Sequence, residues 1–219
     1  MYEWITHTWN PIRGVCPHGC SYCYMKKIYK RFRLPPRPNI VSEKYGYTFG
    51  KNKIIFVGSA FDCWAKNVPD EWIRSILSFV KGNMHNVSFL FQSKNPERFI
   101  DWLGYIPYNA YLCTTLESNR EYPAIYQNAP PIIERVKAMH GIKNRPKMIT
   151  IEPILDFGEE FIQLLKMCQP TQINIGANTG CNHLPEPPSE KIAALVGELR
   201  GFTRVHLKKN LARLYREAG

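Results

Sequence analysis

Short apolar runs rich in β-branched residues alternate along this chain with stretches whose apolar residues recur at helical spacing. The run KIIFVG at 53–58 is followed by the amphipathic stretch 69–82, and NVSFLFQS at 86–93 is followed by the helical pattern at 95–104. Strands that are apolar on successive residues and separated by helices indicate a parallel sheet buried on both faces and joined by right-handed crossovers. The alternation therefore predicts an α/β fold.

The pattern gives six strand and helix units. Six are too few for the closed eight-fold barrel, so we expect an open, partial (β/α)6 TIM-like barrel, with a doubly wound sheet as the alternative. No linker, repeat or low-complexity tract interrupts residues 1–219, which predicts one domain. The expected strands are 7–14, 53–58, 86–93, 110–116, 147–153 and 171–177, with a last run at 203–207. The expected helices are 20–33, 69–82, 95–104, a proline-interrupted region ending near His140, 158–168, 188–201 and a basic terminal helix.

Composition narrows the class of protein. With 44% apolar residues and 219 positions, the chain can bury a substantial core. It shows no apolar run long enough to cross a membrane and no signal-peptide pattern, and its seven cysteines are an odd number. We therefore expect a cytoplasmic protein without disulfides. Lysine and arginine exceed acidic residues by 29 to 18, which favours nucleic acid or another anion as partner or substrate.

Polar residues follow nearly every expected strand. The carboxyl ends of parallel strands meet at one edge of the sheet, where loops converge on the working site. We therefore expect a single site at that edge. The polar residues placed there by the pattern are Ser59, Asp62, Ser93, Lys94, Thr115, Glu117, Asn119, Glu152 and Asn178.

Three cysteines lie within eight positions in the segment GVCPHGCSYCY. Cys16, Cys20 and Cys23 have the spacing C-x3-C-x2-C, and the glycine before Cys20 lets the backbone turn so that the three sulfurs can face one centre. A structural zinc site would need a fourth ligand, for which His18 or His7 is the candidate. A ferredoxin-type cluster would need a fourth cysteine. The remaining interpretation is a four-iron cluster with one iron left open for a substrate or cofactor.

This segment resembles the hallmark C-x3-C-x-aromatic-C of the radical S-adenosylmethionine (SAM) superfamily, with Tyr22 at the aromatic position. The blocks TWNPIRGVCPHGCSYCY, FVGSAFDCW, SKNPERF, TIEPIL and HLKKN together resemble small, often phage-associated proteins of a domain of unknown function related to spore photoproduct lyase. The resemblance implies a 4Fe-4S cluster on Cys16, Cys20 and Cys23. The open iron would hold SAM, and one electron from the cluster would cleave SAM to a 5'-deoxyadenosyl radical that abstracts hydrogen from the substrate. An electron donor such as flavodoxin or ferredoxin would be the partner.

The same resemblance implies roles for the other cofactor-binding residues. Tyr22 would lie near the adenine, and Ser59 and Lys94 would contact the methionyl group. Thr115, with Glu117 or Asn119, would hold the ribose. The Gly-Gly-Glu-Pro element common in the superfamily is replaced by GSAFDCW, so Asp62 or Ser59 is expected to receive the amino group of SAM.

Two catalytic residues are also expected at the site. Cys63 follows a strand and would return a hydrogen atom to a product radical, as a cysteine does in spore photoproduct lyase; Cys181 has a similar position after a later strand. Glu152 would act as a general base or ribose ligand. The contrasting hypothesis is a non-catalytic nucleic-acid-binding module that zinc or a cluster stabilises.

Overall fold

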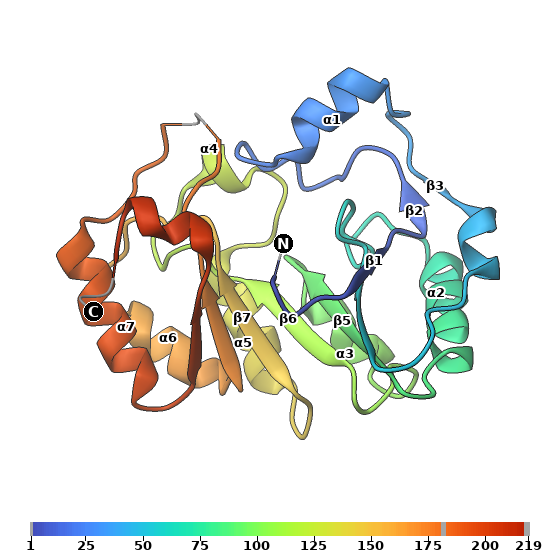
Figure 1. Ribbon diagram of the computed structural model, residues 1–219. Helices are drawn as coiled ribbons and strands as arrows, with labels where there is room; N and C mark the ends of the chain where they lie inside the picture. The colour runs from blue at the N-terminus through green and yellow to red at the C-terminus, as the bar shows by residue number, and fades with distance from the viewer. Residues whose placement is uncertain (1, 181–182, 217–219) are drawn as a thin grey trace.

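Seven parallel strands form the central sheet of the computed structural model, which describes residues 2–180 and 183–216 (Figure 1). All seven expected strands are present, and each neighbouring pair is parallel, as the apolar runs predict. The order is the order of the chain, without the reversal that defines a doubly wound sheet. Across the sheet lie β1 (His7–Trp9), β4 (Lys53–Val57), β5 (Val87–Ser93), β6 (Tyr111–Thr115), β7 (Lys147–Ile151), β8 (Gln172–Ile175) and β9 (Arg204–Leu207).

The expected first strand, 7–14, is divided into two. β1 joins the main sheet, whereas β2 (Ile12–Arg13) pairs antiparallel with β3 (Asn39–Ile40) in a separate two-stranded sheet. Pro11, which lies between β1 and β2, has no N–H to donate to a ladder, and its carbonyl instead accepts a bond from Val41 N at 2.8 Å. The proline therefore ends the main-sheet strand earlier than the sequence pattern suggests.

Helices follow most strands, close to their expected positions. The first helix is shorter than expected because the cysteine segment forms a loop up to Tyr24, and the terminal basic helix is only a 3-10 turn. The helical elements are α1 (Met25–Phe32), η1 (Ser42–Gly46), α2 (Asp70–Gly82), α3 (Glu97–Trp102), α4 (Pro123–Tyr126), α5 (Ile132–Gly141), α6 (Phe161–Cys168), α7 (Ser189–Arg200) and η2 (Lys209–Arg213).

The two faces of the sheet are buried by different partners. On one face, strand residues such as Ile55 and Phe89 pack with α2, α3, α5, α6 and α7 in the main hydrophobic core. On the other face, Leu90, Cys113 and Met148 pack against the N-terminal segment through Tyr2. Figure 1 shows that segment in front of the strands, with α3 and α5 behind them. The N-terminal segment therefore covers this second face, which we call the inner face of the sheet, and leaves the carboxyl ends of the strands open.

The cysteine loop and α1 lie above the carboxyl ends of the strands, with α4 on the opposite side (Figure 1). Among the residues that the structure describes, no helix is both long enough and apolar enough to cross a membrane.

Candidate functional site

A cavity of about 630 Å³ opens at the carboxyl ends of the strands. Its size lies within the usual range for a cofactor or substrate site. Residues from the cysteine loop and α1 form one wall, and residues in or after β4 to β9, together with Tyr2, form the rest. The polar and sulfur-bearing residues that line it are Tyr2, Cys16, His18, Cys20, Tyr22, Cys23, Tyr24, Met25, Lys26, Tyr29, Ser59, Asp62, Gln92, Ser93, Lys94, Thr115, Thr150, Glu152, Asn178, Thr179 and Lys208.

The cysteine loop brings Cys16, Cys20 and Cys23 to the same cavity, as the spacing predicts. Gly19 adopts a φ of 66°, a left-handed conformation that favours glycine, and a side chain there would also place its Cβ 2.7 Å from Gln127 Oε1. The three thiols are free. Within the described ranges, no three His, Cys, Asp or Glu side chains are already arranged as a metal centre. The loop thus gathers the sulfurs on one wall without fixing them in a closed ligand set.

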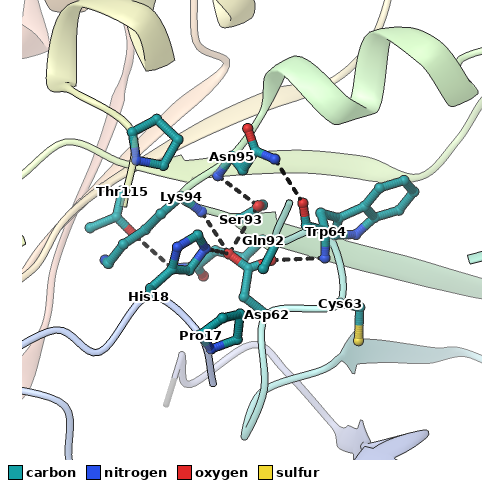
Figure 2. A network of polar contacts seen from close by, with 12 residues as sticks. Pro17, His18, Asp62, Cys63, Trp64, Gln92, Ser93, Lys94, Asn95 and Thr115 are labelled. Carbon is teal, nitrogen blue, oxygen red and sulfur yellow. Dashed lines mark hydrogen bonds and ion pairs between the residues drawn. The ribbon is translucent and has the colours of Figure 1, made fainter. Parts of the chain in front are cut away.

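Asp62 ties this loop to the ends of two strands (Figure 2). Its Oδ2 atom accepts hydrogen bonds from Ser93 Oγ and Lys94 N, both at 2.9 Å, and lies 2.8 Å from His18 Nε2. Its Oδ1 atom accepts a bond from Trp64 N at 2.9 Å. Burial alone would raise the pKa of Asp62, but His18 and these donors hold it below its ordinary value. The carboxylate is thus committed to four protein contacts, which makes it an anchor for the loop.

A second buried carboxylate, Glu117, lies behind the cavity wall. Its Oε1 atom is 3.0 Å from Lys94 Nζ, and its Oε2 atom is 3.0 Å from Arg135 Nη1. Tyr22 donates its hydroxyl to Glu117. Burial opposes ionisation of Glu117, but the two cations hold its pKa below the ordinary value, and Glu117 in turn raises the pKa of Lys94 against the effect of burial.

This buried group carries two cations and one carboxylate, so it has a surplus positive charge. Lys94 carries that charge to the cavity, where its ammonium also lies 5.3 Å from the centre of the Tyr22 ring. An uncompensated buried cation is costly. The arrangement therefore favours binding of an anion next to the cysteine loop.

Burial opposes ionisation of two of the three thiols, Cys16 and Cys20. Burial, followed by the charge of Asp62, raises the pKa of Cys16 to about 12. Burial also raises the pKa of Cys20, although Lys94 opposes the increase. Iron binds thiolates, so loading of this loop with a cluster would release protons, and the nearby cation would stabilise the resulting negative charge.

The opposite end of the cavity has its own polar cluster. Glu152 pairs with Lys208, and its Oε1 atom accepts a hydrogen bond from Asn210 Nδ2 at 2.7 Å. The ammonium of Lys208 lies 4.9 Å from the centre of the Tyr2 ring, and the Tyr2 hydroxyl donates to Gln92 Oε1 at 2.6 Å. Glu152 thus lies in the cavity, as expected, but already has two protein partners.

Ser59 and Thr115 also line the cavity, in agreement with their expected positions. Ser59 Oγ lies 3.3 Å from Asn10 Oδ1, and Thr115 Oγ1 accepts from Gln92 Nε2 at 3.1 Å. Glu117 does not line the cavity itself, but it contacts two residues that do, Lys94 and Tyr22. Asn119 does not reach it: its Oδ1 atom accepts a bond from Gly158 N at 2.7 Å, away from the cavity.

The expectation that Cys63 faces the site is wrong. Cys63 is 2% exposed and belongs to the main hydrophobic core, with its sulfur 3.6 Å from Phe61 O. Figure 2 shows the thiol on the far side of the turn from Asp62 and Lys94. The turn after β4 directs Asp62 inward and its neighbour Cys63 to the core. Cys181 lies outside the described residues.

Several cavity residues were missed by sequence reasoning. Gln92 and Thr150 share the inner face of β5 and β7, a position that alternation along each strand could have indicated. Lys208 follows the last strand, like the other polar residues at strand ends. Tyr2 had no local signal, because its place depends on how the N-terminal segment crosses the sheet.

Solved structures with a similar fold include two kinds of enzyme. One is a spore photoproduct lyase mutant with bound AdoMet and dinucleoside spore photoproduct, with a TM-score of 0.68 and 9% identity over 91% of this chain and 75% of that chain. Another is a radical SAM methyltransferase from Sphaerobacter thermophilus, with a TM-score of 0.58 and 14% identity over 100% of this chain and 68% of that chain. This chain therefore has an α/β fold similar to that of radical SAM enzymes. At these identities the likeness establishes the fold alone.

The sequence itself places the chain in a family. Residues 1–165 match the family model described as protein of unknown function (DUF5131), and the chain belongs to that family. No curated protein sequence matches it.

Proposed function

We propose that this protein is a radical SAM enzyme with a partial (β/α)6 barrel. It binds a 4Fe-4S cluster on Cys16, Cys20 and Cys23 and cleaves SAM reductively to generate a radical that removes hydrogen from a substrate. The observation that carries the proposal is the shared cavity, which joins three free cysteines to the buried surplus charge at Lys94. The fold supports it, because structures similar to this chain include enzymes of that class.

The donor set fits such a cluster better than it fits zinc. Three thiols from one loop face the cavity, and the two histidines considered as a fourth ligand are placed otherwise. His18 directs Nε2 to Asp62 at 2.8 Å, and His7 does not line the cavity. A set of three sulfurs leaves one iron of a four-iron cluster without a protein ligand. When bound, the cluster supplies the electron that breaks a sulfur–carbon bond of SAM.

The residues of the chain bind and orient SAM in this proposal. Lys94 pairs with the carboxylate of the methionyl group, because its ammonium carries the surplus charge of the buried group. Ser59 and Thr115 also line the cavity and offer hydroxyls, and Tyr22 offers its ring to the adenine. Glu117 acts through Lys94 and Tyr22 by holding both in place.

Asp62 has a different role from the one that the sequence suggested. Four hydrogen-bonding contacts already occupy its carboxylate, so it positions the cysteine loop and leaves the amino group of SAM to other partners. Glu152, paired with Lys208 at the other end of the cavity, is proposed to contact the substrate or the ribose. The electron comes from a flavodoxin or ferredoxin.

The test is anaerobic purification followed by reconstitution with iron and sulfide. We expect a brown protein that binds about four iron ions per chain and produces 5'-deoxyadenosine from SAM after reduction with dithionite. Cys20→Ala should lose both properties, whereas Cys113→Ala, which changes a buried cysteine of β6, should retain both. A colourless wild-type protein that binds stoichiometric zinc under the same conditions would overturn the proposal and favour the non-catalytic module.

A further inference from the structure

The N-terminal part of the chain carries most of its surplus charge. Residues 4–42 contain seven lysines and arginines and no aspartate or glutamate, within a chain whose net charge is +11. Five of these cations lie on α1 or at its C-terminal cap: Lys26, Lys27, Lys30, Arg31 and Arg33. We call this group the α1 ridge. It concentrates positive charge on a single eight-residue helix.

All five side chains of the α1 ridge are exposed. Over the ranges 2–180 and 183–216, none of them forms an ion pair with a carboxylate, whereas Lys94, Arg120, Arg135, Lys191, Lys208 and Arg213 do. Ion pairs elsewhere in the protein neutralise charge locally, but the ridge has no such compensation. Its field is therefore available to an external anion.

The ridge adjoins the cavity. α1 begins two residues after Cys23. Tyr24 and Lys26 lie at the start of this helix and also line the cavity. The Tyr24 hydroxyl donates to Ser59 O at 3.0 Å, which fixes the start of α1 beside the strand ends. In Figure 1, α1 lies above the carboxyl ends of the strands. A molecule bound along the ridge thus continues directly into the site.

Aromatic side chains lie among the cations. Tyr24 is 56% exposed and Phe32 is 60% exposed, one at each end of α1, and the Arg31 guanidinium lies 5.4 Å from the centre of the Phe32 ring. Exposed rings interspersed with cations are typical of surfaces that stack bases and contact phosphates. A protein partner such as an acidic electron carrier fits the ridge less well, because the cores of protein–protein interfaces are depleted in lysine.

We propose that the α1 ridge binds the phosphodiester backbone of a single nucleic-acid strand and directs one nucleotide into the cavity as the substrate. This inference rests on the proposed function, since it names the substrate class of the same site. An eight-residue helix is about 12 Å long, so the ridge covers a few nucleotides. A single strand fits better than a duplex, because a nucleotide must leave the base stack to enter a cavity.

The test measures binding of fluorescein-labelled single-stranded DNA and RNA oligonucleotides by anisotropy across a salt series. The variant K27Q/K30Q/R31Q removes three charges from the ridge. The matched control K81Q/K137Q/K143Q removes three exposed charges from elsewhere on the surface. If each substituted ridge residue contacts a phosphate, the slope of log K against log salt should fall in magnitude by about 2 for the ridge variant and stay unchanged for the control. The DNA and RNA arms identify which strand is preferred.

Separate readouts distinguish the two proposals. Oligonucleotide binding without 5'-deoxyadenosine formation would support the ridge and refute the proposed function. Formation of 5'-deoxyadenosine with equal salt slopes in wild type and ridge variant would refute the ridge alone. A third outcome would overturn the nucleic-acid inference. If the ridge variant binds oligonucleotides like wild type, but produces less 5'-deoxyadenosine than wild type with reduced flavodoxin and the same amount with dithionite, the ridge serves an electron donor.

Discussion

The Nε2 atom of His18 lies 2.8 Å from the Oδ2 atom of Asp62, and both side chains are almost fully buried. His18 is inside the cysteine loop, between Cys16 and Cys20, whereas Asp62 follows β4. The contact therefore joins the loop to the sheet. Because Asp62 also accepts bonds from the end of β5, one carboxylate holds together the three segments that surround the sulfurs.

We predict that Asp62→Ala destabilises the protein strongly. The substitution leaves buried donors of His18, Ser93 and two backbone amides without an acceptor, and each buried donor left unsatisfied costs about 1 to 3 kcal/mol. Urea denaturation should show this loss in the free energy of unfolding. Reconstituted iron per folded chain should fall as well, because the loop loses its anchor.

Asp70→Ala is the control for this prediction. Asp70 also forms an ion pair, with Arg98, but its side chain is 67% exposed. Exposed pairs contribute about 1 kcal/mol or less, so this variant should remain near wild type. Equal effects of Asp62→Ala and Asp70→Ala on stability and iron content would contradict the anchoring role.

Cys63→Ala tests the placement of Cys63 in the core. Loss of a small buried side chain should lower the free energy of unfolding by about 1 kcal/mol, measured by urea denaturation. Because the thiol does not reach the cavity, 5'-deoxyadenosine formation and product identity should be unchanged per folded chain. A variant that folds normally but yields an altered product would instead assign Cys63 to hydrogen return.

The sequence predicts the features of the fold that depend on local periodicity. The apolar runs locate all seven main-sheet strands, and the parallel sheet follows from the helices between them. The rule that polar residues after parallel strands share one edge correctly groups Ser59, Lys94, Thr115 and Glu152 around one cavity. These inferences succeed because spacing along the chain decides them.

Other features depend on contacts between distant segments and leave no local signal. Asp62 and Cys63 are neighbours after the same strand, yet the turn directs one to the loop and the other to the core. Tyr2 reaches Thr150 because the N-terminal segment crosses the inner face of the sheet. Asn119 is directed away from the cavity, because its Oδ1 atom accepts a hydrogen bond from Gly158 N. Side-chain direction in loops is set by tertiary packing, so spacing does not determine it.

Lys94→Gln should weaken SAM binding. The substitution removes the surplus charge of the buried group while Glu117 keeps its contact with Arg135 at 3.0 Å. A hydrogen bond to a charged group contributes about 1.5 to 3 kcal/mol, so the KM for SAM should rise about 10- to 100-fold. The measurement is 5'-deoxyadenosine formation at varied SAM concentration. Lys81→Gln, an exposed substitution on α2, is the control. An unchanged KM in Lys94→Gln would show that Lys94 does not bind SAM.

Asp156 should make stability dependent on pH. A hydrogen bond from Lys191 Nζ at 2.6 Å, reinforced by the charges of Lys191 and Arg120, holds the pKa of Asp156 below its ordinary value of 3.8. A lowered pKa means that the ionised form stabilises the folded state at neutral pH, and that this contribution disappears as the pH falls through the folded-state pKa. Asp156→Asn should therefore lower the free energy of unfolding at neutral pH by about 1 kcal/mol, and the difference from wild type should shrink in acid.

Urea denaturation at several pH values measures both effects, with Asp101→Asn, an exposed position on α3, as the control. A difference that stays constant down to low pH would show that the Asp156 contacts do not depend on its charge.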